Sequence, residues 1–153
     1  MDDSKASVAE RIEMFQGDVD KLSAYLPWLI KNSGAKLWNT YTPENSGPGT
    51  LKVPVYDSTL LAFVKAVQKT RFYNKYYVYT YSKYRIRDYK DELRLIEKAE
   101  LKDMEVLGDI LARYIQKGMV KGAVWNEGVE YGVYEKAIIK MKEIIEFYTR
   151  PGK

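Results

Sequence analysis

The residues of this chain whose types and spacing could bind a ligand are concentrated between Lys69 and Lys90. Seven tyrosines, half of the fourteen in the chain, alternate there with seven basic residues and one acid. This tyrosine–basic segment therefore carries a formal charge of +6, whereas the whole chain carries +4. Lysine and arginine neutralise phosphates, tyrosine rings stack on bases, and tyrosine and arginine are favoured at protein interfaces. The candidate binding residues are Arg71, Tyr73, Lys75, Tyr76, Tyr79, Lys83, Arg85 and Arg87.

Three interpretations of the tyrosine–basic segment are open. Its rings and cations could form a surface that binds a protein partner. The same residues could instead bind a nucleic acid or a nucleotide. They could also be structural, with the rings packed against the core beside a solvated basic face. The observation that separates these interpretations is whether the rings lie exposed beside the cations.

The residue types that are absent limit the catalytic chemistry. The chain has no cysteine and no histidine. Disulfides, thiolate nucleophiles, cysteine or histidine metal ligands and hydrolase triads are therefore excluded. A carboxylate-dependent enzyme remains as an alternative, and Glu127 and Glu130, which flank Gly128, are the acids that we nominate for it. We predict that the protein is not an enzyme and that it binds no cofactor and no metal.

Length and composition predict one domain. The chain has 153 residues, of which 46% are hydrophobic and 30% are charged, as in ordinary globular domains. No apolar run approaches the roughly 20 residues of a membrane-spanning helix, and the first residues lack the pattern of a signal peptide. We therefore expect a single helical domain over residues 1–153, located in the cytoplasm and not in a membrane. Its oligomeric state is left open.

The elements that must position the candidate residues are amphipathic helices, and the two clearest lie within residues 101–148. The final helix, Val133 to Tyr148, has apolar residues at helical spacing and stops before Pro151. A second apolar stripe follows Asp103, a suitable N-cap, and ends at Gly118, which suits a left-handed C-cap. These two helices should form the core.

Four glycines separate the two core helices, at Gly118, Gly122, Gly128 and Gly132. They predict tight backbone, either a broken helix or a small β-hairpin near residues 120–132. No glycine pattern of a nucleotide-binding loop is present, so turn formation is favoured over a phosphate cradle.

Two helices are expected near the start of the chain. The first runs from Ser4 to Phe15, Gly17 interrupts it, and Asp18 caps the second. Proline fixes its own φ and has no backbone N–H, so Pro27 should cause a kink or a new start. This element should end at Asn32-Ser33-Gly34.

Two further helices should follow in the middle of the chain. Asp57 caps the first, which ends near Thr70, and Asp88 caps the second. Between them, residues 76–81 have strand propensity. Asn74 as a cap and tyrosines at helical spacing fit a helix equally well, so this segment is left open between strand and helix.

Residues 35–56 are expected to form one long irregular loop. Prolines, glycines and asparagines there argue against a regular element. Loops of this length are usually functional or disordered. The alternatives are a lid over a pocket and a loose surface excursion.

Four short runs carry a resemblance to a known family: Val55-Tyr56-Asp57, Tyr81 to Tyr84, Leu95 to Leu101, and Gly122…Glu127-Gly128 before the last helix. Over Pro54 to about Ile144 the chain resembles an uncharacterised family of small proteins from Firmicutes and their mobile elements. Members often have an arginine-containing motif where this chain has Gln116 to Val120, so no functional residue is transferred.

The resemblance implies a helix within the tyrosine–basic segment and a mobile-element setting, in which small inhibitors of host defence are common. We therefore predict an all-α domain of about six to seven helices that binds a macromolecular partner, as an inhibitor of a host defence system. A protein is the first choice of partner, and a nucleic acid or a nucleotide is the alternative.

Overall fold

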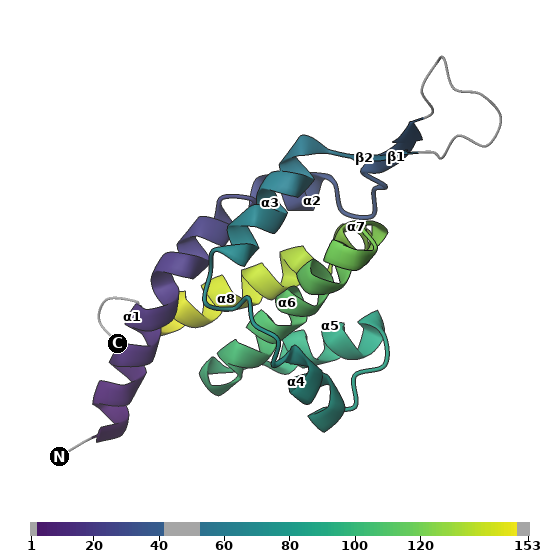
Figure 1. Ribbon diagram of the computed structural model, residues 1–153. Helices are drawn as coiled ribbons and strands as arrows, with labels where there is room; N and C mark the ends of the chain where they lie inside the picture. The colour runs from purple at the N-terminus through teal and green to yellow at the C-terminus, as the bar shows by residue number, and fades with distance from the viewer. Residues whose placement is uncertain (1–2, 42–52, 150–153) are drawn as a thin grey trace.

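Helices make up most of the fold in a computed structural model that describes residues 3–41 and 53–149 (Figure 1). This confirms the predicted all-α class. The described residues contain eight α-helices, seven of them with seven or more residues, and one small sheet. The helices are α1 (Asp3–Ser23), α2 (Leu26–Lys31), α3 (Ser58–Gln68), α4 (Tyr77–Lys83), α5 (Tyr89–Lys98), α6 (Met104–Val120), α7 (Ala123–Glu130) and α8 (Val133–Thr149).

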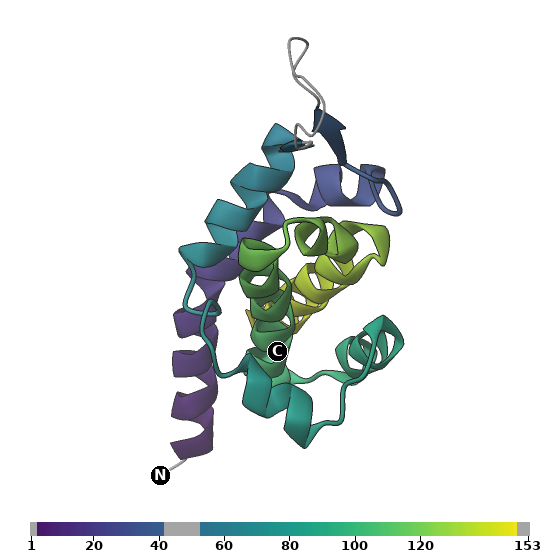
Figure 2. The same cartoon turned by 45° about the vertical axis from the view of Figure 1, so that its right-hand side comes forward.

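Helices α6 and α8 form the centre of the domain, as their periodicity predicted. They lie between α1 and α3 on one side and α4 and α5 on the other (Figures 1 and 2). Met104, Leu107 and Met141 from these two helices are 0% exposed. Burial of such side chains stabilises the fold by roughly 1.5–3 kcal/mol each. No helix in the described ranges is both long and apolar enough to cross a membrane.

Helix α1 runs through Gly17 without a break, so the predicted interruption and the N-cap at Asp18 are wrong. Gly17 is exposed, and a Cβ there would meet nothing within 4 Å. Phe15 and Val19, on either side of it, are buried in the core and keep this stretch helical. Asp18 instead accepts a hydrogen bond of 3.1 Å from the backbone N–H of Arg71.

Helix α2 begins anew after Tyr25 and has Pro27 in its first turn, which confirms the predicted new start. Proline is tolerated there because the first N–H groups of a helix have no intrahelical acceptor. The chain leaves this helix through Gly34, whose φ of +85° is the left-handed conformation that glycine adopts readily.

A small antiparallel sheet pairs β1 (Trp38–Tyr41) with β2 (Val53–Tyr56), with Trp38 opposite Tyr56. The prediction of an irregular segment over residues 35–56 is therefore wrong at both of its ends. The two aromatic rings pack at 6.0 Å across the strands, a long-range contact that local turn residues do not reveal. The remaining part, with the predicted lid or surface excursion, lies outside the described residues.

Aspartate caps position the helices of the middle segment as predicted. Asp57 Oδ1 accepts hydrogen bonds from the backbone of Thr59 and Leu60 at the start of α3. Asp88 does the same at the start of α5. Asp103 does precede α6, but its carboxylate accepts from the backbone N–H of Glu100 instead of capping that helix.

The glycine-spaced connector is a broken helix, so the hairpin alternative and the C-cap at Gly118 are wrong. Helix α6 continues through Gly118 because the indole of Trp125 packs directly on it. A Cβ at Gly118 would lie 2.0 Å from Trp125 Cδ1. The indole Nε1 donates a 2.9 Å hydrogen bond to the carbonyl of Ile115, which fixes α7 against α6. Gly132, with φ of +72°, then leads into α8.

Candidate functional site

Helix α4 carries two of the eight candidate residues, Tyr79 and Lys83, and has Tyr76 at its N-cap position. Contacts at its start and on its inner face anchor it to the rest of the domain. Ahead of its first turn, Asn74 Oδ1 accepts a 2.8 Å hydrogen bond from the backbone of Tyr76, although the N-cap position itself is Tyr76. Thr80, 8% exposed, donates a 2.6 Å hydrogen bond to Asp109 Oδ2 on α6. These contacts settle the open choice between strand and helix, and they direct the opposite face of α4 to solvent.

The tyrosines of the segment divide into two groups. Tyr76 and Tyr79 are 69% and 68% exposed, and Tyr84 is 39% exposed. Tyr73, Tyr77, Tyr81 and Tyr89 are half-buried. Three of the seven rings thus lie exposed beside the cations. The other four are partly packed into the domain, as the structural interpretation predicted.

A groove of about 630 Å³ lies along the exposed rings, between α4 and parts of α1 and α6. Four of the eight candidate residues line it: Arg71, Tyr76, Tyr79 and Lys83. Lys75 and Arg85 are exposed, whereas Tyr73 packs against the hydrophobic core. Arg87 lines a different cavity, so the structure does not bring all eight residues together.

The groove contains charges of both signs. Arg71 pairs with Asp18 at 3.6 Å, and Lys83 Nζ lies 5.4 Å from the centre of the Tyr84 ring. Within residues 3–41 and 53–149, Lys83 forms no ion pair. The carboxylates of Glu105 and Asp109 also line the groove. Burial raises the pKa of Asp109, and the Thr80 hydrogen bond partly opposes this rise.

Arg85 terminates α4 in an unusual conformation, with φ of +54°. Its backbone N–H donates to the carbonyl of Ser82, and that of Ile86 donates to the carbonyl of Tyr81. This is a Schellman ending, in which glycine normally occupies the left-handed position. An exposed arginine there costs about 1 kcal/mol of backbone strain, so the position keeps a cation at the expense of stability.

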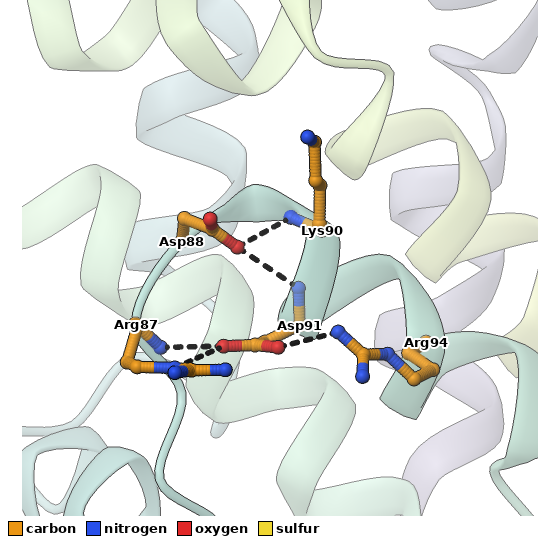
Figure 3. Close-up of polar contacts among 5 residues, drawn as sticks. All are labelled: Arg87, Asp88, Lys90, Asp91 and Arg94. Carbon is orange, nitrogen blue, oxygen red and sulfur yellow. Dashed lines mark hydrogen bonds and ion pairs between the residues drawn. The ribbon is translucent and has the colours of Figure 1, made fainter.

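Arg87 contacts α5 and does not line the groove. Its backbone N–H and Nε both donate to Asp91 Oδ2, at 2.9 and 3.3 Å, while Arg94 donates to Asp91 Oδ1 (Figure 3). Asp88 Oδ1 meanwhile accepts from the backbone of Lys90 and Asp91. The hydrogen bond from the Arg87 backbone, together with the two guanidinium groups, lowers the pKa of Asp91.

A second cavity, of about 470 Å³, lies on the other side of α4 and is bounded by α5, α6 and α7. Its floor contains Glu92, which is 1% exposed. Tyr81 and Tyr114 donate hydrogen bonds of 2.6 and 2.5 Å to the two oxygens of this carboxylate. Burial raises the pKa of Glu92, an effect that the two phenols and Arg113 partly offset.

The sequence analysis did not single out Glu92, Asp109 or Arg113. The two acids carried a usable signal, because each falls in an apolar stripe at helical spacing. Glu92 precedes the buried Ile96 by four residues, and Asp109 precedes the buried Ala112 by three. A carboxylate in such a position must be paired or protonated when the helix packs.

The acids nominated for an enzymatic site do not share one environment. Glu130 accepts a 2.9 Å hydrogen bond from Asn126, a fully buried residue that also binds the backbone of Ala35 and Leu37. Glu127 lines the second cavity. In the part of the chain that the structure describes, no group of three or more acids could hold a metal ion.

Comparisons with protein-family models, with curated proteins and with solved structures return no match for this chain. The resemblance to the Firmicutes family therefore stays a prediction. The function has to be inferred from the geometry of the α4 region itself.

Proposed function

We propose that this chain is a non-catalytic interaction protein that binds a protein partner through the outer face of α4. We define this α4 surface by Tyr76, Tyr79, Lys83, Tyr84 and Arg85. The observation that carries the proposal is the pair of rings at Tyr76 and Tyr79, 69% and 68% exposed one turn apart beside a groove. Exposed large aromatics next to cations are typical of interface hot spots.

The mixed charge of the groove favours a protein over a nucleic acid. Glu105 and Asp109 lie in its wall with the cations, and ionised carboxylates repel phosphates. Met14, which is 37% exposed, also lines the groove and adds apolar area that a phosphate backbone would not cover. A polypeptide, which has apolar groups and charges of both signs, fits this lining better.

The rigid attachment of α4 supports tight binding. The helix is short, but Thr80 joins it to α6 and Tyr81 joins it to α5 through side-chain hydrogen bonds. Rings on an anchored helix lose little further entropy when a partner covers them, so more of the interaction energy appears as affinity. In the mobile-element setting that the resemblance implies, the partner would be a host-defence protein that this chain inhibits.

Affinity purification tests the proposal. The tagged chain and a Tyr76→Ser/Tyr79→Ser variant would each be used to capture partners from a Firmicutes lysate, followed by mass spectrometry. Tyr148→Ser is the matched control, because Tyr148 is also exposed, at 46%, but lies at the end of α8. We expect a protein that the wild type and the control retain and that the double variant loses. Equal capture by all three chains contradicts the proposal.

A charge test separates the protein partner from the nucleic-acid alternative. Lys83→Glu/Arg85→Glu, which reverses both cations of the α4 surface, should weaken capture of the protein partner. Gel shifts with single- and double-stranded DNA and RNA at low salt should show no complex. A nucleic-acid complex that weakens steeply with salt and is lost in the Tyr76→Ser/Tyr79→Ser variant would contradict the proposal. It would identify a nucleic acid as the partner of the α4 surface.

A further inference from the structure

The cavity behind α4 has the size and composition of a small-molecule site. Its volume of about 470 Å³ falls in the usual range of ligand pockets, which is roughly 300–1,000 Å³. Helices α4, α5, α6 and α7 contribute most of its lining, and the connector residues Ile86, Arg87, Asp88 and Tyr131 contribute the rest. None of the exposed rings of the α4 surface, Tyr76, Tyr79 and Tyr84, belongs to it.

Arg113 presents donors that its protein neighbours do not use. Its guanidinium lies over the rings of Tyr114 and Tyr81, at 5.0 and 5.7 Å from their centres. Arg113 Nη1 forms an ion pair with Glu92 Oε2 at 3.9 Å, a distance that is too long for a hydrogen bond. Among residues 3–41 and 53–149, no acceptor within hydrogen-bond distance faces this guanidinium. With a side chain only 27% exposed, it is a preorganised receptor for an anion.

A second cation strengthens this anion receptor. Lys117 follows Arg113 by one helical turn on α6, lines the same cavity and is exposed. It forms no ion pair inside the described part of the chain. Arg87 lines the cavity from the side of α5, where Asp91 already holds it.

The carboxylates in the lining are mostly engaged. Glu92 accepts hydrogen bonds from two phenols, and Asp88 caps α5 through its Oδ1. Glu127 is the acid that remains to accept a hydrogen bond from the hydroxyl or amino group of a ligand.

Aromatic rings make up the rest of the lining. Tyr89 and Tyr131 stack parallel at 4.3 Å with an interplanar angle of 6°, which joins the start of α5 to the end of α7. Tyr77 packs edge-on against Tyr81 at 6.2 Å. Tyrosine rings provide apolar and stacking faces for flat heterocycles. Cations and rings in one enclosed space are what a nucleotide requires.

From this arrangement we propose that the cavity binds a nucleoside monophosphate. The phosphate contacts Arg113 and Lys117, and the base packs against the rings of Tyr77 and of the stacked pair Tyr89 and Tyr131. This site is separate from the α4 surface and goes beyond the proposed function.

Calorimetric titration tests the site with probes that separate the two parts of the ligand. The four common ribonucleoside monophosphates would be compared with adenosine, which has no phosphate, and with inorganic phosphate, which has no base. We expect saturable binding of at least one monophosphate, with both partial probes weaker by about tenfold or more, since each lacks one set of contacts. No saturable binding of any monophosphate up to about 1 mM overturns the proposal. Inorganic phosphate that binds as tightly as the monophosphates also overturns it.

Two substitutions locate the site. Lys117→Gln should weaken the monophosphate by about tenfold through loss of one charge-assisted contact. Lys121→Gln is the matched control, because Lys121 is exposed at the end of the same helix but does not line the cavity. Arg113→Gln should weaken binding further, and Lys117→Gln keeps the test valid if that variant fails to fold. Equal affinity of the wild type and Lys117→Gln contradicts the site.

Failure of this site is distinguishable from failure of the proposed function. Neither Tyr76 nor Tyr79 lines the cavity, so the Tyr76→Ser/Tyr79→Ser variant should bind the monophosphate like the wild type. A loss of monophosphate binding in that variant would place the nucleotide on the α4 surface and overturn the cavity as its site.

Discussion

The hydroxyl of Tyr81 on α4 donates a hydrogen bond of 2.6 Å to Oε2 of Glu92 on α5. The other oxygen of the same carboxylate accepts from Tyr114 on α6. One buried acid of α5 therefore connects α4, the helix of the proposed interface, to α5 and to the central helix α6. Because Glu92 is 1% exposed, its protonation and pairing affect the stability of this whole side of the domain.

Glu92→Gln should change how stability depends on pH. Burial raises the pKa of Glu92 above its ordinary value of 4.5, so the native state retains a proton that the unfolded chain releases. The Glu92 contribution to stability is therefore full below pH 4.5 and is lost as pH rises through the raised native pKa. Glutamine does not titrate, so the variant should gain stability relative to the wild type as the pH rises above 4.5. Urea unfolding across this range measures the difference, and a difference independent of pH would contradict the assignment.

Thr80→Val should destabilise the protein by about 1–3 kcal/mol, because it leaves the buried carboxylate of Asp109 without its hydroxyl partner. Thr70→Val is the control. Thr70 is also buried, but its hydroxyl donates to the carbonyl of Val67, which accepts the Thr70 backbone N–H as well. The control substitution should lower the free energy of unfolding by less than Thr80→Val does. Urea unfolding at constant pH measures the free energy of unfolding of both variants. Equal decreases would show that the Thr80–Asp109 hydrogen bond contributes no more than the local Thr70 bond.

Arg85→Gly should stabilise the domain by about 0.5–1 kcal/mol, because glycine adopts the left-handed conformation without strain. Arg85 has φ of +54°, so Arg85→Ala, which keeps a Cβ, should give no such gain. Thermal unfolding of both variants provides the measurement. The same Arg85→Gly variant should bind the protein partner less tightly, and a variant that gains both stability and affinity would argue against a role for this cation.

Two glycine-to-alanine substitutions should have opposite signs. Gly17→Ala lies in an open part of α1, where a Cβ meets nothing, and should stabilise by about 0.5–1 kcal/mol. Gly118→Ala would place its Cβ 2.0 Å from Trp125, and should destabilise by about 1–3 kcal/mol through overpacking. Denaturant unfolding of both variants checks the pair. Stabilisation by Gly118→Ala would show that the indole moves away at little cost.

Local signals predicted much of the fold. Asp57 and Asp88 were identified as caps from their place before apolar stripes, and both bind backbone N–H groups two and three residues ahead. Gly17 and Gly118 were read as helix ends and are not. Both lie inside helices because residues around them are buried, and for Gly118 the decisive neighbour is Trp125, which no local pattern indicates.

The candidate site was predictable only in part. Composition located the tyrosine–basic segment, but it could not separate the exposed Tyr76 and Tyr79 from Tyr81, whose hydroxyl is bound to Glu92. Nor did it show that Arg87 turns away from the groove toward Asp91.

The sequence alone shows the helical periodicity and the aspartate caps, because apolar spacing and side-chain-to-backbone hydrogen bonds act over a few residues. It also shows that histidine and cysteine are absent. Tertiary structure alone decided which rings face solvent and which carboxylates become buried. It also created the two cavities on either side of α4. The physical reason is that exposure and pKa depend on neighbours from other helices, such as Asp109 beside Thr80, which are remote along the chain.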